Sequence, residues 1–127
     1  MKVLITGGAG FIGANLAQSL TSRSDIDEVV VLDDLSFGYL KNLDDIGVRF
    51  VKGSILDERV LADASSGVAA IVHLAARSSV PRSIAHPMAA HKDNATGTAL
   101  VLEAARAAGD VQVIVASSSS VYGANDT

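Results

Sequence analysis

The sequence predicts an α/β fold in which helices cover both faces of a parallel β-sheet. Short apolar runs alternate with stretches in which apolar residues recur every three or four positions. This alternation is typical of buried strands that are separated by amphipathic helices. The chain has 127 residues, of which 49% are hydrophobic and 19% charged, enough for one domain with a sizeable core. A cluster of glycines also separates the first apolar run from the first helical pattern.

The first half of the chain supplies two strands and one helix. Val3, Leu4 and Ile5 form a continuous apolar run, which predicts a strand at residues 2–6. Apolar residues at helical spacing from Phe11 onward predict a helix over residues 11–22, and the polar residues after it form a turn. The next apolar run predicts a strand at residues 28–33. Residues 34–47 are expected to form a loop with one helical turn near residues 39–43.

The second half of the chain repeats the alternation. Strands are predicted at residues 48–52, 70–74 and 111–116. Asp57 is a candidate N-cap for a short helix after the third strand. Pro81 and Pro87 predict a loop after the fourth strand, and a long helix then runs to about residue 108, where Gly109 ends it. Right-handed connections between parallel strands give the strand order 3-2-1-4-5.

The turn after the first strand is rich in glycine. Gly7, Gly10 and Gly13 stand three residues apart, and residues 8–13 match the pattern G-x-G-x-x-G. Glycines here permit a positive φ angle and let the backbone approach a pyrophosphate closely. The helix that follows presents unpaired N–H groups and the positive end of its dipole to the phosphates. The turn therefore predicts dinucleotide binding by a Rossmann-type sheet.

Asp33 indicates which dinucleotide is bound. It ends the second apolar run and lies 20 residues after Gly13, where the motif places an acidic residue. A carboxylate at this strand end can accept hydrogen bonds from both ribose hydroxyls and repels a 2′-phosphate, so NAD is expected rather than NADP. The alternative is a glycine turn in an α/β protein that binds no nucleotide.

Composition excludes several classes of function. The net charge is −4 and there is no basic cluster, so electrostatic binding to nucleic acid or to an acidic membrane is not expected. The sequence contains no cysteine, and its three histidines are scattered, so neither a disulfide nor a metal site is expected. The first residues lead directly into a strand and no apolar run is long enough to span a membrane, which favours a cytoplasmic protein.

Six segments of the sequence together resemble one family. They are residues 6–13, 31–36, 73–76, 79–83, Asn94 with Gly97-Thr98, and residues 117–123. In this order they are similar to the extended short-chain dehydrogenase/reductase family. The likeness is strongest to its NAD-dependent sugar-nucleotide epimerases and dehydratases, and among these to UDP-glucose 4-epimerase-like proteins. The resemblance implies NAD as cofactor and a nucleotide sugar, best matched by a UDP-sugar, as substrate.

The resemblance also implies roles for individual residues. The amides of Phe11 and Ile12 meet the pyrophosphate, Asp33 holds the adenosine ribose, and Asn94 supports the turn after the fourth strand. Ser118 takes the place of the catalytic Ser/Thr, although a strand-end serine that only caps backbone groups is the alternative. The expected cofactor-binding residues are Gly7, Gly10, Phe11, Ile12, Gly13, Asp33, Asp34, Ser36, Ser54, Ile55, Leu74, Ala75, Ala76 and Asn94.

Two features depart from the family pattern. Ser54 stands where the family usually has an aspartate that reaches the adenine amino group; a serine can still accept a hydrogen bond there, but without charge. The catalytic Tyr-x-x-x-Lys pair is missing, because Tyr39 is followed four residues later by Leu43 and Tyr122 by Asp126. The last predicted strand is also apolar on both faces, which suits an interior strand.

We therefore expect residues 1–127 to be the N-terminal, NAD-binding part of a longer enzyme. The chain alone is expected to be inactive, and the full-length protein could form a homodimer. Two alternatives stay open: a non-catalytic dinucleotide-sensing module of the same fold, and an NAD(P)-dependent reductase of the family. Two neighbouring features have simple structural explanations. His73 is expected to be a packed, hydrogen-bonded residue, and Arg77 and Arg82 to be solvated or paired locally rather than bound to a diphosphate.

Overall fold

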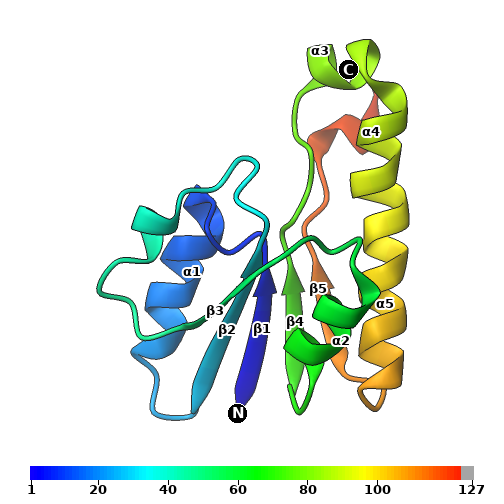
Figure 1. Cartoon of the computed structure of the whole chain (residues 1–127). Coiled ribbons are helices and arrows are strands. Elements are labelled where there is room, and N and C mark those ends of the chain that lie inside the picture. The colour runs from blue at the N-terminus through cyan, green and yellow to red at the C-terminus, as the bar shows by residue number, and fades with distance from the viewer. Residues whose placement is uncertain (124–127) are drawn as a thin grey trace.

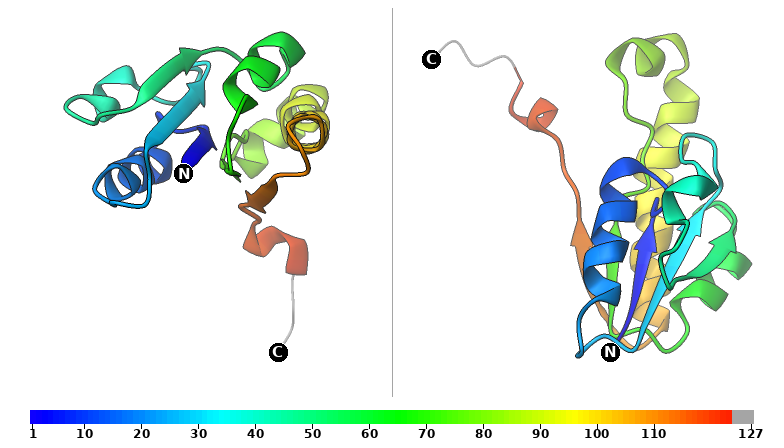
Figure 2. Two further views of the ribbon diagram at one scale, coloured as in Figure 1. Left: turned by 90° about the horizontal axis from the view of Figure 1, so that it is seen from below. Right: turned by 90° about the vertical axis from the view of Figure 1, so that its left-hand side faces the viewer.

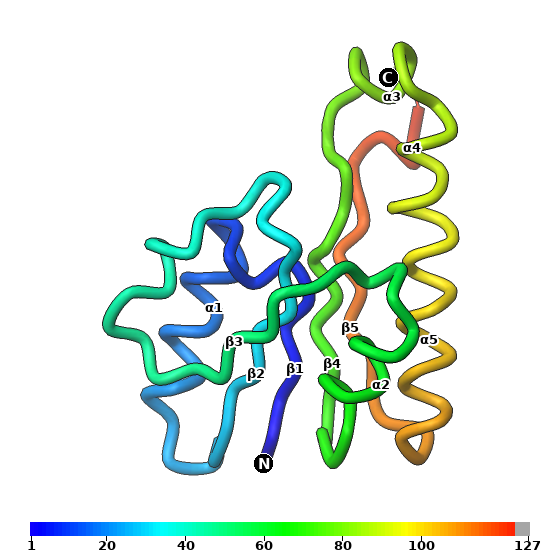
Figure 3. The backbone as a smooth tube through the Cα atoms, viewed as in Figure 1, coloured from blue at the N-terminus to red at the C-terminus, as the bar shows by residue number. Residues whose placement is uncertain are grey.

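The sheet has the predicted parallel order, β3-β2-β1-β4-β5. The computed structural model describes residues 1–123. Its strands are β1 (Lys2–Thr6), β2 (Glu28–Asp33), β3 (Arg49–Lys52), β4 (Ala70–His73) and β5 (Gln112–Val115). The predicted ends of β1 and β2 are confirmed, and the other three strands are one or two residues shorter than predicted. Figure 3 shows the chain leaving β3 at one edge and crossing the sheet before it enters β4 on the other side of β1.

Helices lie on both faces of the sheet, as Figures 1 and 2 show. Helix α1 (Phe11–Thr21) and a 3₁₀ turn (Leu40–Leu43) cover one face, while α2 (Glu58–Ser65) and α5 (Gly97–Ala107) cover the other. Asp57 is the N-cap of α2, as predicted, because its carboxylate accepts hydrogen bonds from the backbone N–H groups of Arg59 and Val60 at 3.1 and 3.2 Å.

The strands are apolar on both sides because each side faces a separate core. Leu4 and Val30 are fully buried against α2 and α5, whereas Ile5 and Val31 are fully buried on the side of α1. Successive side chains of a strand point to opposite faces, so a strand between two helical layers needs apolar residues at every position. This explains the continuous apolar runs of β1 and β2.

The segment between β4 and α5 differs from the prediction. Pro81 and Pro87 were expected in a loop, but they lie in the first turns of two short helices, α3 (Val80–Ala85) and α4 (Pro87–His91). Proline fits a first helical turn because no N–H donor is required there. A π-helical turn, Lys92–Thr96, then connects α4 to α5 without a break. In Figure 1 both short helices extend beyond the carboxyl ends of the strands.

The end of α5 and the position of β5 agree more closely with the prediction from the sequence. Helix α5 ends at Ala107, and Gly109 has a φ angle of +108°, which agrees with its predicted role as the stop signal. Strand β5 then forms one edge of the described sheet. Its Ile114 and Val115 side chains are 53% and 45% exposed, so β5 presents apolar surface at this edge. Within residues 1–123 no helix is both long enough and apolar enough to cross a lipid bilayer.

A chain of hydrogen bonds joins β1 to α5 through His73. Ala75 N–H donates to Thr6 Oγ1 at 3.3 Å, and Thr6 Oγ1 lies 2.7 Å from His73 Nδ1. His73 Nε2 lies 3.0 Å from Thr98 Oγ1, which donates to the carbonyl of Asn94 at 2.6 Å. Because the Thr98 hydroxyl donates to this carbonyl, it accepts from Nε2–H of His73. His73 is thus a buried, hydrogen-bonded residue, as expected.

Ser65, the last residue of α2, is buried, with 1% of its surface exposed. Its Oγ atom has no hydrogen-bond partner among the described residues. Because a buried hydroxyl without a partner is destabilising, Ser65→Ala should raise the free energy of unfolding by about 1 kcal/mol in urea denaturation. The matched control is Ala64→Ser at the neighbouring, fully buried position, which should lower it. A loss of stability in Ser65→Ala would show that the hydroxyl has a partner in solution.

The stability of the fold should depend on pH through His73. Burial lowers the pKa of His73 from its ordinary value of 6.5, so below that pH the unfolded chain binds a proton that the folded chain resists. The free energy of unfolding should therefore be constant near neutral pH and fall as the pH drops below about 6.5. In His73→Gln this part of the fall should disappear when urea denaturation is repeated between about pH 7 and 5. If the free energy of unfolding falls equally with pH in both proteins, His73 is not the cause of the fall.

Candidate nucleotide-binding site

A cavity of about 420 Å³ opens at the carboxyl ends of the strands. This is where open α/β sheets bind ligands, and the volume lies in the range of small-molecule sites. Every predicted cofactor-binding residue except Asn94 lines it. The lining residues that the sequence analysis did not single out are Leu32, Phe37, Gly38, Gly53, Ser78, Asp93 and Ala116.

The floor of the cavity is the turn between β1 and α1. Gly7 has a φ angle of +70°, and a Cβ atom added to it would lie 2.7 Å from the backbone nitrogen of Ala75. A Cβ added to Gly13 would lie 2.5 Å from the Cα of Gly8. Both positions therefore require glycine, one for its conformation and its close approach to β4, the other for the packing of α1 against the turn.

The N-terminus of α1 faces this turn without a side-chain cap. Gly10 is its N-cap residue and, among the described residues, no side chain accepts a hydrogen bond from the first turn of the helix. Phe11 and Ile12 line the cavity, and their side chains are 83% and 67% exposed. The unpaired N–H groups and the helix dipole make this end of α1 suited to an anion such as a pyrophosphate.

Asp33 lies beside the turn, is 8% exposed and is held in one orientation. Its Oδ2 accepts a hydrogen bond from Ala9 N–H at 3.0 Å, and its Oδ1 accepts one from Leu35 N–H at 2.8 Å. Leu35 adopts a φ angle of +64°, a left-handed conformation that is costly for a residue other than glycine. The backbone thus bears strain at the position that orients the carboxylate.

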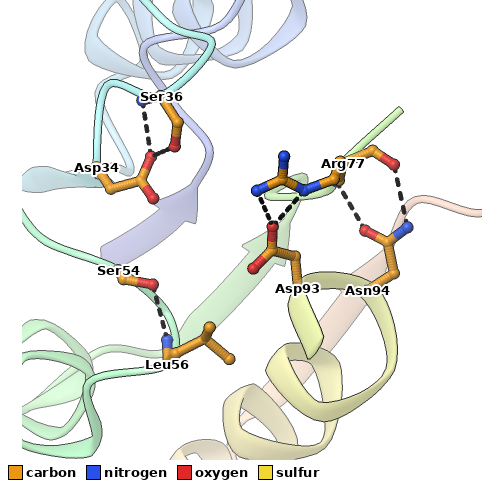
Figure 4. A network of polar contacts seen from close by, with 7 residues as sticks. All are labelled: Asp34, Ser36, Ser54, Leu56, Arg77, Asp93 and Asn94. Carbon is orange, nitrogen blue, oxygen red and sulfur yellow. Dashed lines mark hydrogen bonds and ion pairs between the residues drawn. The ribbon is translucent and has the colours of Figure 1, made fainter. Parts of the chain in front are cut away.

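Three further predicted residues, Asp34, Ser36 and Ser54, line the cavity on the same side. Asp34 Oδ1 accepts hydrogen bonds from the backbone N–H and the hydroxyl of Ser36, so this pair forms a local turn. Ser54 Oγ accepts a hydrogen bond from Leu56 N–H at 3.1 Å. Figure 4 shows both groups across an opening from Arg77, Asp93 and Asn94.

The opposite side of the cavity is braced by Asn94. Its side chain accepts a hydrogen bond from Arg77 N–H at 2.7 Å and donates one to the Arg77 carbonyl at 3.1 Å. Asn94 therefore lies outside the cavity lining but supports the segment after β4, which is the role that the resemblance implies for it. The Arg77 guanidinium pairs with Asp93, so the expectation of local pairing is confirmed for this arginine.

Ser118 lies apart from the cavity lining. It is exposed and is the N-cap of a 3₁₀ turn (Ser119–Tyr122), where its Oγ accepts from Ser120 N–H and donates to Ser120 Oγ, both at 3.1 Å. Ser118 therefore caps a backbone N–H group in this structure, which is the alternative role named for it above. Across residues 1–123 no group of three or more metal-ligating side chains gathers at one point.

Comparisons with known proteins agree with the resemblance. The model of the NAD dependent epimerase/dehydratase family matches residues 3–127. The UDP-glucose 4-epimerase of Erwinia amylovora is 36% identical over 98% of this chain, which spans 39% of that protein. A UDP-glucose 4-epimerase of Klebsiella pneumoniae is 34% identical over 97% of this chain and 93% of its own length.

A solved structure extends the agreement to the fold. DesIV, a dTDP-glucose 4,6-dehydratase from Streptomyces venezuelae with NAD and TYD bound, superposes with a TM-score of 0.89 and 42% identity. The match covers 100% of this chain and 42% of DesIV, so the chain spans about two fifths of that protein. On sequence and on fold alike, the chain belongs to the NAD-dependent epimerase/dehydratase family.

Proposed function

We propose that residues 1–127 form the NAD-binding domain of a sugar-nucleotide epimerase or dehydratase, with UDP-glucose 4-epimerase as the preferred activity. The observation that carries this proposal is the oriented carboxylate of Asp33 beside the uncapped N-terminus of α1. The relatives support both activities, since epimerases and a dehydratase are among them, and the dehydratase structure contains NAD.

The residues present fit a dinucleotide in three respects. Gly7 and Gly13 leave space for close backbone approach that a Cβ atom would fill. The N–H groups of Phe11 and Ile12 are available to the pyrophosphate oxygens. Asp33 uses one acceptor site on each oxygen for a backbone amide, and an ionised carboxylate has further lone pairs for the two ribose hydroxyls.

The charge of this region favours NAD over NADP. Asp33 and the adjacent Asp34 both line the cavity, and two carboxylates there would repel a 2′-phosphate on the ribose. Bound NAD would supply the hydride acceptor for oxidation of a sugar carbon. The part of this chain is to bind the cofactor, orient it and exclude water from its phosphate and ribose groups.

Ser118 is the candidate catalytic residue of this chain. Its hydroxyl would bind the oxygen of the reacting sugar hydroxyl, which requires it to exchange its present hydrogen bond with Ser120 for one to the substrate. A tyrosine followed four residues later by lysine does not occur in the sequence, so the chain itself has no candidate for the general base. Asp126, which takes the lysine position after Tyr122, lies outside the described residues.

The ribose assignment predicts that Asp33→Ala weakens NAD binding much more than Asp34→Ala does. Asp33 is buried and would lose a charge-assisted contact worth about 1.5–3 kcal/mol, whereas Asp34 is exposed and bonds to Ser36. Isothermal titration of NAD into the two variants should show at least about a tenfold difference in Kd. Circular dichroism serves as the control for folding. Equal losses in the two variants would contradict the assignment.

The reaction class is tested with a panel of UDP- and dTDP-sugars. The 127-residue chain should bind NAD but change none of them, because it lacks the tyrosine and lysine pair. The product of the complete gene should convert one sugar into its epimer without net formation of NADH, since the hydride returns to the same sugar. Accumulation of NADH would exclude the epimerase. Consumption of added NAD(P)H would favour a reductase. Binding of NAD without turnover of any sugar would favour a sensing module.

A further inference from the structure

Asp93 is a carboxylate in the cavity wall to which neither the family pattern nor the sequence analysis gives a role. It lies in the π-helical turn Lys92–Thr96, and its side chain is 28% exposed. Its Oδ2 accepts a hydrogen bond from Arg77 Nε at 2.7 Å, and the same oxygen lies 2.7 Å from Arg77 Nη2 in an ion pair. Among the described residues no hydrogen bond reaches the other oxygen, Oδ1. In Figure 4 this oxygen points away from Arg77, toward the side of the opening on which Ser54 lies.

Several contacts fix this carboxylate in place. Asn94 holds the backbone of Arg77 by accepting a hydrogen bond from its N–H and donating one to its carbonyl. The Arg77 guanidinium lies 5.2 Å from the centre of the Phe37 ring. Phe37 follows β2 and Arg77 follows β4, so the contact joins the two sides of the cavity mouth. The free oxygen of Asp93 is therefore a preorganised acceptor, and a partly buried charged acceptor discriminates more strongly than a mobile surface group.

Ser54 faces this acceptor from the opposite wall of the cavity. Its oxygen already accepts a hydrogen bond from Leu56 N–H, which leaves the hydroxyl hydrogen and one uncharged lone pair for a ligand. Asp34 is the other carboxylate with an unused oxygen, but it is exposed and follows directly after the residue assigned to the ribose. Of these two cavity carboxylates with an unused oxygen, Asp93 is thus the less exposed and the more firmly held.

We propose that Asp93 recognises the adenine of the dinucleotide by accepting a hydrogen bond from its exocyclic amine. This inference rests on the proposed function, because it places the adenosine of NAD in the cavity. The exocyclic amine of adenine is a hydrogen-bond donor, which complements a carboxylate oxygen. Hypoxanthine and guanine present a carbonyl at the same place, which the carboxylate repels. Asp93 would then supply the charged acceptor that Ser54, at the end of β3, does not provide.

The test compares NAD with nicotinamide hypoxanthine dinucleotide, in which the amine is replaced by a carbonyl oxygen. Titration calorimetry on the full 127-residue chain should show that the unaltered protein binds NAD at least about tenfold more tightly than the hypoxanthine analogue. In Asp93→Asn this ratio should fall to near one or reverse, because the amide can donate to the carbonyl. Unchanged discrimination in a folded Asp93→Asn protein would overturn the proposal.

Two further variants separate recognition from structural effects. Asp63→Asn makes the same chemical change on α2, at an exposed residue outside the cavity lining, and should keep the preference for NAD. Arg77→Gln removes the ion pair but retains the Asp93 carboxylate, so both ligands should weaken while their ratio stays above about fivefold. Loss of the preference in either variant would overturn the role of Asp93.

The proposed function can fail separately from this inference. If the unaltered chain binds neither dinucleotide, both proposals fail. If it binds NAD and the hypoxanthine analogue equally well, the dinucleotide site stands and the role of Asp93 alone is refuted.

Discussion

The close backbone contact at the first βα turn determines how the site is built. Gly7 lies so near the segment after β4 that a Cβ atom would fall within 3 Å of Ala75, and Gly13 lies equally close to Gly8. These contacts bring the end of β1, the start of α1 and the end of β4 together without intervening side chains. The N–H groups of α1 are therefore left open at the place where Asp33 and the segment after β4 converge. Larger residues in the turn would separate these elements.

Around this contact the cavity has two carboxylates that are oriented in different ways. Asp33 is held by backbone N–H groups of the turn and of the strained residue Leu35. Asp93 is held by a side chain, the guanidinium of Arg77, which in turn depends on Asn94 and Phe37. Both devices fix the direction of an acceptor before a ligand arrives, which lowers the cost of ordering the site on binding. The network through His73 supports the same region, since it links the end of β1 to the carbonyl of Asn94.

Most of the fold could be predicted from the sequence, because burial on both faces leaves an unambiguous pattern in the strands. The run Val29-Val30-Val31-Leu32 and the cap at Asp57 are local signals, and the structure agrees with both. The region of Pro81 and Pro87 was predicted wrongly because proline also fits the first turn of a helix, and sequence alone does not separate this role from a loop. The π-helical turn before α5 leaves no such local signal, since its residues also suit an ordinary helix.

The sequence by itself determined the glycine turn and the acid at the end of β2, because both depend on residue type at a fixed spacing along the chain. The strand order followed from the alternation of strands and helices, because connections between parallel strands are right-handed. Only the tertiary structure decided which side chains from distant segments share the cavity. Phe37, Arg77 and Asp93 are far apart in sequence, and their contacts arise because parallel strands bring their carboxyl ends to one edge of the sheet. The free oxygen of Asp93 likewise depends on which atom Arg77 engages, and that is a matter of three-dimensional geometry rather than of sequence.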